Sequence, residues 1–159
     1  MNTEKAELRR YEDDLNVSGA GVVVLGVWSI VRVLIELFLN TKEYLDFGSD
    51  DPDSAMMGMI VVIAIIVIVS FVIMKIHLYI GLNAMRAAKG REHKGGYFVA
   101  AIIIAVLSVL SLSTYVEDLQ KLDRLDTTLA SMLVDITTIY IFIVVILSSI
   151  KIRKLKGES

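Results

Sequence analysis

Four long apolar stretches alternate with short charged segments along the chain. Residues 17–39, 55–80, 95–116 and 127–150 together contain only four charged side chains, whereas the shorter segments between and around them carry the other 30. About 20 apolar residues in a helix cross the roughly 30 Å hydrocarbon core of a bilayer. Membrane strands instead alternate apolar and polar positions, and runs such as residues 59–70 do not. The pattern therefore predicts an all-α polytopic membrane protein.

The polar segments set the expected boundaries. We expect one transmembrane domain over residues 17–156, followed by a C-terminal tail at 157–159. The segment 1–16 carries Leu8, Tyr11 and Leu15 on one side, which predicts a short amphipathic helix on the cytoplasmic membrane surface. We expect the third helix to continue beyond the bilayer, as a longer helix or as an outer interfacial turn, because leucines recur at threefold spacing after its apolar run. The four expected helices cover residues 17–39, 55–82, 95–124 and 127–152.

Lysine and arginine are unequally shared between the segments that flank the helices. Residues 1–16, 86–94 and 151–156 contain eleven of them, whereas the loops at 40–54 and 117–126 contain three and are acidic. Basic flanks usually stay on the cytoplasmic side of a membrane. We therefore expect a multi-pass plasma-membrane protein with its N-terminus and C-terminus in the cytoplasm, which agrees with four crossings.

Small and polar residues recur on one face of each helix, and such residues mark helix contacts in lipid. The steps of three and four are those of left-handed bundle packing, so we expect an antiparallel four-helix bundle. In the first helix the stripe is Gly19, Val22, Leu25, Gly26, Ser29, Arg32, Val33 and Glu36, and in the second it is Met56, Met59, Ile63, Val67, Ser70, Met74, His77 and Gly81. In the third it is Tyr97, Ala101, Ile104, Ser108, Ser111 and Tyr115, and in the fourth it is Ser131, Asp135, Thr138, Phe142, Val145 and Ser149.

Three of the four charges within the spans lie on these inward stripes, namely Arg32, Glu36 and Asp135. A charge near the bilayer centre costs at least about 2.5–3.5 kcal/mol and needs a partner or water. One interpretation is that Arg32 bridges the two carboxylates and fixes helix register. The other is a solvated outer vestibule that binds a proton, a small cation or a polar ligand. The hydroxyl groups expected nearby belong to Ser108, Ser111, Thr138 and Tyr115.

The basic residues at the cytoplasmic ends allow two readings as well. Lys75 can extend its amine to the interface while His77 packs there, or the pair can act as a pH-responsive gate. The segment 86–94 is explained by membrane topology alone, or it contacts anionic lipid headgroups. The residues of such a lipid contact would be Lys75, Arg86, Lys89 and Arg91.

Little in the composition supports catalysis. The chain has no cysteine, two histidines and a net charge of −2, and it lacks the short motifs of phosphate-binding loops, hydrolases and zinc enzymes. We expect no catalytic residue, no metal, no cofactor and no nucleic-acid partner. The first functional hypothesis is a non-enzymatic subunit, regulator or homo-oligomer, whose partners are the lipid bilayer and a second copy or another membrane protein. The alternative is a small ion- or proton-coupled transporter that uses Arg32, Glu36 and Asp135.

Overall fold

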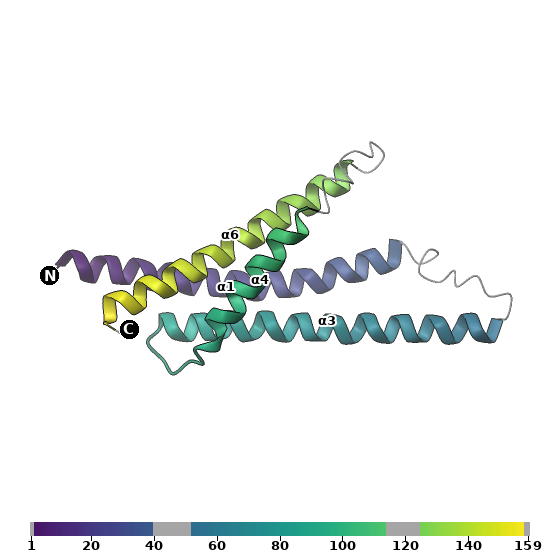
Figure 1. Ribbon diagram of the computed structural model, residues 1–159, viewed down its shortest axis with the longest axis horizontal. Helices are drawn as coiled ribbons and strands as arrows, with labels where there is room; N and C mark the ends of the chain where they lie inside the picture. Colours follow the sequence, from purple (N-terminus) through teal and green to yellow (C-terminus); the bar gives the residue numbers. More distant parts are fainter. Residues whose placement is uncertain (1, 40–51, 114–124, 158–159) are drawn as a thin grey trace. The chain divides into compact units, whose positions relative to one another are not determined.

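The computed structural model describes residues 2–39, 52–113 and 125–157. These residues form four α-helices in the order α1 (Asn2–Leu39), α3 (Pro52–Ala88), α4 (Gly96–Ser111) and α6 (Leu125–Lys156), shown in Figure 1. The all-helical fold class expected from the sequence is thereby confirmed. Three of the helices contain stretches long and apolar enough to cross a membrane, over Thr3–Ile35, Met56–Ala88 and Ser131–Lys156.

Helix α1 runs without interruption through the boundary expected after residue 16. The segment 2–16 contains neither glycine nor proline, so nothing in it breaks a helix. The change there is one of polarity and not of backbone conformation. The expected amphipathic segment therefore forms the first turns of α1, and its Leu15 is fully buried.

Helix α3 ends in a hydrogen-bonded motif built on Gly90. The N–H of Arg91 donates to the carbonyl of Arg86 at 2.9 Å, and the N–H of Gly90 donates to that of Ala87 at 3.1 Å. This is the Schellman pattern, in which the residue after the helix takes a left-handed conformation that suits glycine. Gly90 has a φ of 63°, so the helix end is encoded locally.

Helix α4 is the shortest of the four, with 16 residues, which corresponds to about 24 Å of rise. It ends at Ser111, and residues 112 and 113 form a turn. The hydroxyls of Ser111 and Ser113 donate to the carbonyls of Ser108 and Leu110, at 2.8 and 2.7 Å. Side chains that bond to the backbone in this way compete with helix continuation. The rest of the helix expected over 95–124 lies outside the described residues from position 114 onward.

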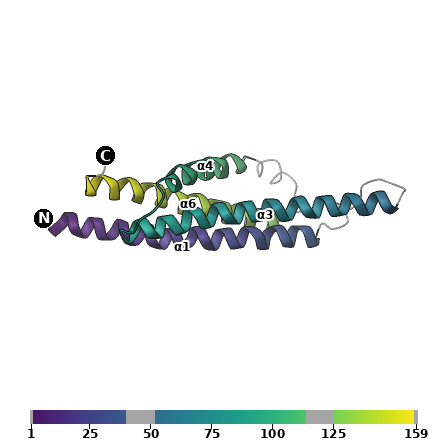
Figure 2. The same cartoon turned by 90° about the horizontal axis from the view of Figure 1, so that it is seen from below.

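The chain divides into two compact units. Unit 1 comprises Met1–Val23 and Tyr79–Ser159, and unit 2 comprises Val24–Leu78. In unit 1, α4 packs along α6 (Figures 1 and 2). In unit 2, residues 24–39 of α1 and 52–78 of α3 run side by side in both views. The largest fully buried side chains all belong to unit 1: Tyr97, Phe142, Leu15, Ile80, Val22, Val145 and Ser149.

Glycine pairs bring α1 and α3 into close approach. A Cβ atom on Gly81 would lie 2.5 Å from the Gly19 carbonyl oxygen, and one on Gly19 would lie 2.9 Å from the Gly81 oxygen. Within unit 2, a Cβ on Gly26 would lie 2.6 Å from the Cβ of His77. Larger residues at these three positions would push the helices apart, as in other close helix pairs of small residues.

The expected inward stripes are confirmed in part on α1, α4 and α6: about half of their described positions are buried, the others are half-buried, and Ser111 on α4 is exposed. Gly19, Val22 and Gly26 are buried on α1. On the other two helices the buried stripe residues are Tyr97, Ala101, Phe142, Val145 and Ser149. The stripe expected on the second helix is wrong for Met56, Met59 and Val67, which are all exposed on α3. The regular spacing of these large apolar side chains therefore does not by itself mark a buried face.

Candidate functional site

The structure describes the side chains of two of the three charged residues expected within the spans. Arg32 is half-buried on α1 and belongs to unit 2, whereas Asp135 is half-buried on α6 and belongs to unit 1. Each takes part in an interaction with another group. Glu36 lies on α1, but its side chain is outside the described set. The bridge expected from Arg32 to both carboxylates stays a prediction.

Two of the four hydroxyl groups expected around that cluster, those of Thr138 and Ser111, bond to their own helices. Thr138 donates from Oγ1 to the carbonyl of Val134 at 2.8 Å, and Ser111 bonds within α4 as described above. Ser108 is half-buried on α4, and Tyr115 lies outside the described residues. A hydroxyl that donates to its own helix still offers its oxygen as an acceptor.

Lys75 and His77 differ in their surroundings although both lie on α3. The Lys75 amine lies 4.7 Å from the centre of the Phe71 ring, within the range of a cation–π interaction. His77 is buried, and its Nδ1 donates to the carbonyl of Ile73 at 2.9 Å. Because Nδ1 carries the proton in that bond, Nε2 is the acceptor atom of the neutral ring.

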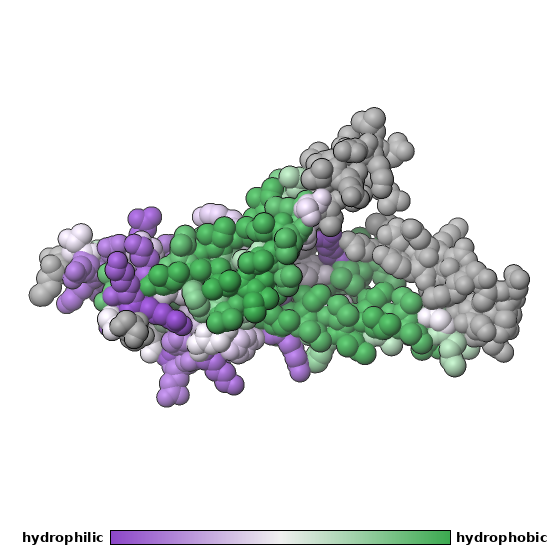
Figure 3. Space-filling model, in the orientation of Figure 1, coloured by the Kyte–Doolittle hydropathy of each residue, from purple (hydrophilic) through white to green (hydrophobic). Residues whose placement is uncertain are grey.

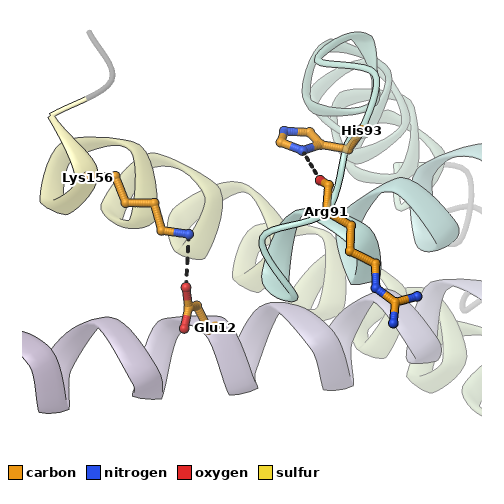
Figure 4. A network of polar contacts seen from close by, with 4 residues as sticks. All are labelled: Glu12, Arg91, His93 and Lys156. Carbon is orange, nitrogen blue, oxygen red and sulfur yellow. Dashed lines mark hydrogen bonds and ion pairs between the residues drawn. The ribbon is translucent and has the colours of Figure 1, made fainter.

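The polar groups of unit 1 gather where α1 begins and α6 ends. Figure 3 shows hydrophilic residues at this end and an apolar surface over α4 and the adjoining part of α6. The Lys156 amine lies 2.9 Å from a carboxylate oxygen of Glu12 (Figure 4). The Lys151 amine, on the same two helices, lies 5.9 Å from the Tyr11 ring centre. The C-terminal turns of α6 thus contact the N-terminal half of α1.

The segment 86–94, which we call the basic turn, connects α3 to α4 and is held by side chains as well as by the Schellman motif. Asn83 is buried on α3. Its Oδ1 accepts from the N–H of Lys94 at 3.0 Å, and its Nδ2 donates to the carbonyl of Tyr79 at 2.7 Å. His93 Nδ1 donates to the carbonyl of Arg91 at 3.1 Å (Figure 4). These bonds fix both ends of the basic turn.

A buried hydroxyl pair joins the start of α4 to α6. The Tyr97 hydroxyl and Ser149 Oγ lie 2.9 Å apart, and Ser149 Oγ donates to the carbonyl of Val145 at 2.7 Å. Since a serine hydroxyl has one hydrogen, Tyr97 is the donor to Ser149. Beside this pair the Arg153 guanidinium lies 5.1 Å from the Phe98 ring centre. The base of α4 is therefore anchored by both a hydrogen bond and a cation–π contact.

Two polar residues of unit 1 are missed by reasoning from the sequence. Asn83 stands three residues before the segment 86–94, and its only signal in the sequence is that an asparagine side chain often bonds to nearby backbone groups near a helix end. Asn16 belongs to no motif, and its Oδ1 is buried without a hydrogen-bond partner in the described structure. The change from polar to apolar residues after position 16 predicts where a span begins, but it does not predict what the side-chain amide of Asn16 contacts.

The described residues hold no group of three or more His, Asp or Glu side chains placed to bind a metal ion. Comparison with known proteins finds no matching family model, no similar curated protein and no similar solved structure.

Proposed function

We propose that the protein is an integral membrane protein that acts without catalysis, through association with a second copy or with another membrane protein. Its helices cross the bilayer four times as an antiparallel bundle. The start of α1, the basic turn and the end of α6 lie on the cytoplasmic face of the plasma membrane.

One observation carries the membrane part of this proposal. The apolar window of α3 has none of its residues buried inside the chain, and the windows of α1 and α6 have 22% of theirs buried. Soluble monomers rarely expose contiguous apolar patches larger than a few hundred Å². The exposed side chains on α3 include Val61, Ile65, Ile68, Phe71 and Val72. A bilayer accommodates such a surface, whereas water does not.

The contacts at the polar end of unit 1 support the proposed orientation. The ion pair between Lys156 and Glu12 brings the end of α6 to the first turns of α1. Gly95, which precedes α4, lies near Arg153 of α6, since a Cβ on Gly95 would be 3.8 Å from its Nη2. Three segments rich in Lys and Arg thus meet at one end of unit 1, as the positive-inside rule requires of cytoplasmic flanks.

The association part can be tested by cross-linking, because the chain has no native cysteine. Single cysteines would replace exposed apolar residues on each helix: Val24 on α1, Val67 on α3, Val106 on α4 and Leu133 on α6. Oxidation in native membranes should link copies through at least one of these positions, or the chain should copurify with a fixed partner. A strict monomer with neither result would contradict the proposal.

The transport alternative has a specific observation in its favour, namely that Asp135 is half-buried on an apolar helix. Ionisable groups in spanning helices often serve ion or proton paths. Asp135→Asn and Glu36→Gln should each abolish proton or cation flux into liposomes if this alternative holds. Flux that is absent in the unaltered chain, or equal in the variants, would remove it and leave the association hypothesis.

A further inference from the structure

The basic turn carries a dense positive charge on exposed side chains. Arg86, Lys89, Arg91 and Lys94 are all exposed, and Glu92 is the one acid between them. The segment 86–94 therefore has a net charge of +3. Figure 4 shows the Arg91 side chain extending away from the turn, on a different side from the His93 ring.

Membrane topology alone would not require this segment to be ordered. Charges direct the orientation of a membrane protein by their number and position near the spans, and a flexible loop serves as well. Here the Schellman motif fixes one end, and Asn83 fixes the other by accepting the N–H of Lys94. Order at a charged surface favours binding, because a backbone already held in place loses less freedom when a ligand arrives.

The surroundings of the turn fit an amphiphile better than a free anion. Directly after it, α4 exposes Val99, Ile102 and Ile103, which offer an apolar surface to acyl chains. The half-buried Phe98 stands in the sequence between the bases and these apolar residues, where aromatic side chains mark membrane interfaces. Phosphate diesters prefer arginine and lysine donors.

We propose that the basic turn is a preordered binding surface for the phosphate headgroup of an anionic phospholipid in the cytoplasmic leaflet. Arg86, Lys89 and Arg91 contact the phosphate, and Asn83 is a positioning residue that acts through the backbone of Lys94. The inference rests on the proposed membrane insertion. It differs from the sequence expectation by leaving out Lys75, which lies over Phe71 in unit 2.

Native mass spectrometry of the full chain in detergent can test the proposal with two probes, phosphatidylglycerol and phosphatidylcholine. The unaltered chain should retain phosphatidylglycerol preferentially. Each base near an anionic surface contributes about a fivefold change in affinity, so the triple variant Arg86→Gln, Lys89→Gln, Arg91→Gln should lower that retention by at least about tenfold. Retention of phosphatidylcholine should stay unchanged.

A matched control removes the same charge elsewhere. Lys5→Gln, Arg9→Gln, Arg10→Gln neutralises three exposed bases on α1 and should leave phosphatidylglycerol retention within about twofold, since screening limits action over a distance. If both triple variants lose retention equally, binding follows total charge and the proposal is wrong. Inorganic phosphate added as a competitor should displace little of the lipid, and full displacement would contradict an amphiphile site.

Two further variants test the order of the turn while keeping its charges. Asn83→Ala removes the bond to Lys94, and Gly90→Ala strains a φ of 63° although the added methyl would meet no atom within 4 Å. Both should reduce phosphatidylglycerol retention severalfold without changing phosphatidylcholine retention. Unchanged phosphatidylglycerol retention in both would overturn the preordered surface. Extraction of membranes at alkaline pH tests insertion separately, because an inserted chain stays in the membrane pellet. A chain that stays in the pellet but shows no preference for phosphatidylglycerol would contradict the lipid site and leave the proposed insertion intact.

Discussion

Unit 1 packs its helices through small and hydrogen-bonding residues, whereas unit 2 consists of two apolar segments with little buried between them. Among the side chains of unit 2 that the structure describes, only Gly26 and His77 are buried. Unit 1 contains the whole set of fully buried large side chains named above. In lipid, apolar side chains gain little by leaving the acyl chains for one another. Valine and isoleucine give unit 2 its exposed apolar surface, while glycine, serine, asparagine and tyrosine specify the packing of unit 1.

The largest expected loss of stability comes from truncating a buried phenylalanine of unit 1, and an exposed phenylalanine of unit 2 serves as the comparison. Phe142 is fully buried in unit 1, and Phe71 is 60% exposed in unit 2. Phe142→Ala should lower the free energy of unfolding by about 3 kcal/mol, at the low end of values for buried aromatic residues, because lipid removes part of the transfer term. Phe71→Ala should change it by less than about 0.5 kcal/mol. Unfolding in detergent, followed by circular dichroism, measures the free energy of unfolding of both variants. Equal losses would contradict the claim that buried side chains stabilise unit 1 and not unit 2.

The second largest loss of stability is expected where α1 and α3 approach each other closely in unit 1. Gly81→Ala places a methyl group 2.5 Å from a backbone oxygen that cannot move freely, so we expect a loss of about 1–3 kcal/mol. Gly21→Ala is the control, since its Cβ would meet the end of the flexible Ile141 side chain at 3.2 Å. The same unfolding assay applies. If Gly21→Ala were as destabilising as Gly81→Ala, the close approach of α1 and α3 at Gly81 would not be the cause of the loss.

Removal of the buried hydroxyl pair should have a smaller effect. Tyr97→Phe deletes the donor to Ser149 and should cost about 0.6 kcal/mol, the average for interhelical hydrogen bonds in membranes, and at most about 1.7 kcal/mol. A double-mutant cycle with Ser149→Ala isolates the pair. In unit 2, Ser29 donates to the carbonyl of Leu25 in its own helix, so Ser29→Ala should be nearly neutral. A coupling energy near zero for Tyr97 and Ser149 would contradict the role assigned to the pair.

The smallest effect concerns the ion pair at the polar end of unit 1. The side chains of Lys156 and Glu12 are each 27% exposed, and solvent-accessible pairs contribute about 0.2–1 kcal/mol. Lys156→Gln should therefore lower the Tm only slightly, and the loss should vanish at high salt. A loss that persists in high salt would indicate that the pair holds α6 against α1 more firmly than its exposure suggests.

The sequence predicted the helices better than their ends. The period of small and polar residues located part of the buried faces of α1, α4 and α6, because small side chains allow two helices to approach closely. It misjudged α3, where methionine and valine follow a regular period without being buried. A hydropathy boundary after residue 16 suggested a break, but hydropathy does not report backbone conformation, and α1 continues.

The candidate site was less predictable, for a physical reason. Exposed bases such as Arg86, Lys89 and Arg91 can be read from the sequence, but the bond from Asn83 to the N–H of Lys94 joins residues eleven apart. Such a contact depends on the path of the turn, which Gly90 sets through its left-handed conformation. The pairing of Arg32, Glu36 and Asp135 also depends on tertiary placement, and helix periodicity gives only the face on which each residue lies.

Cysteine accessibility tests the central claim of membrane insertion most directly, because every introduced thiol is the only one in the chain. Cysteines would replace Glu7 near the start of α1, Lys89 in the basic turn, Lys154 near the end of α6 and Val67 within α3. We predict that a membrane-impermeant maleimide reaches positions 7, 89 and 154 only from the cytoplasmic side and never reaches position 67 in an intact bilayer. Labelling of positions 7 and 154 from opposite sides, or free labelling of position 67, would contradict the account.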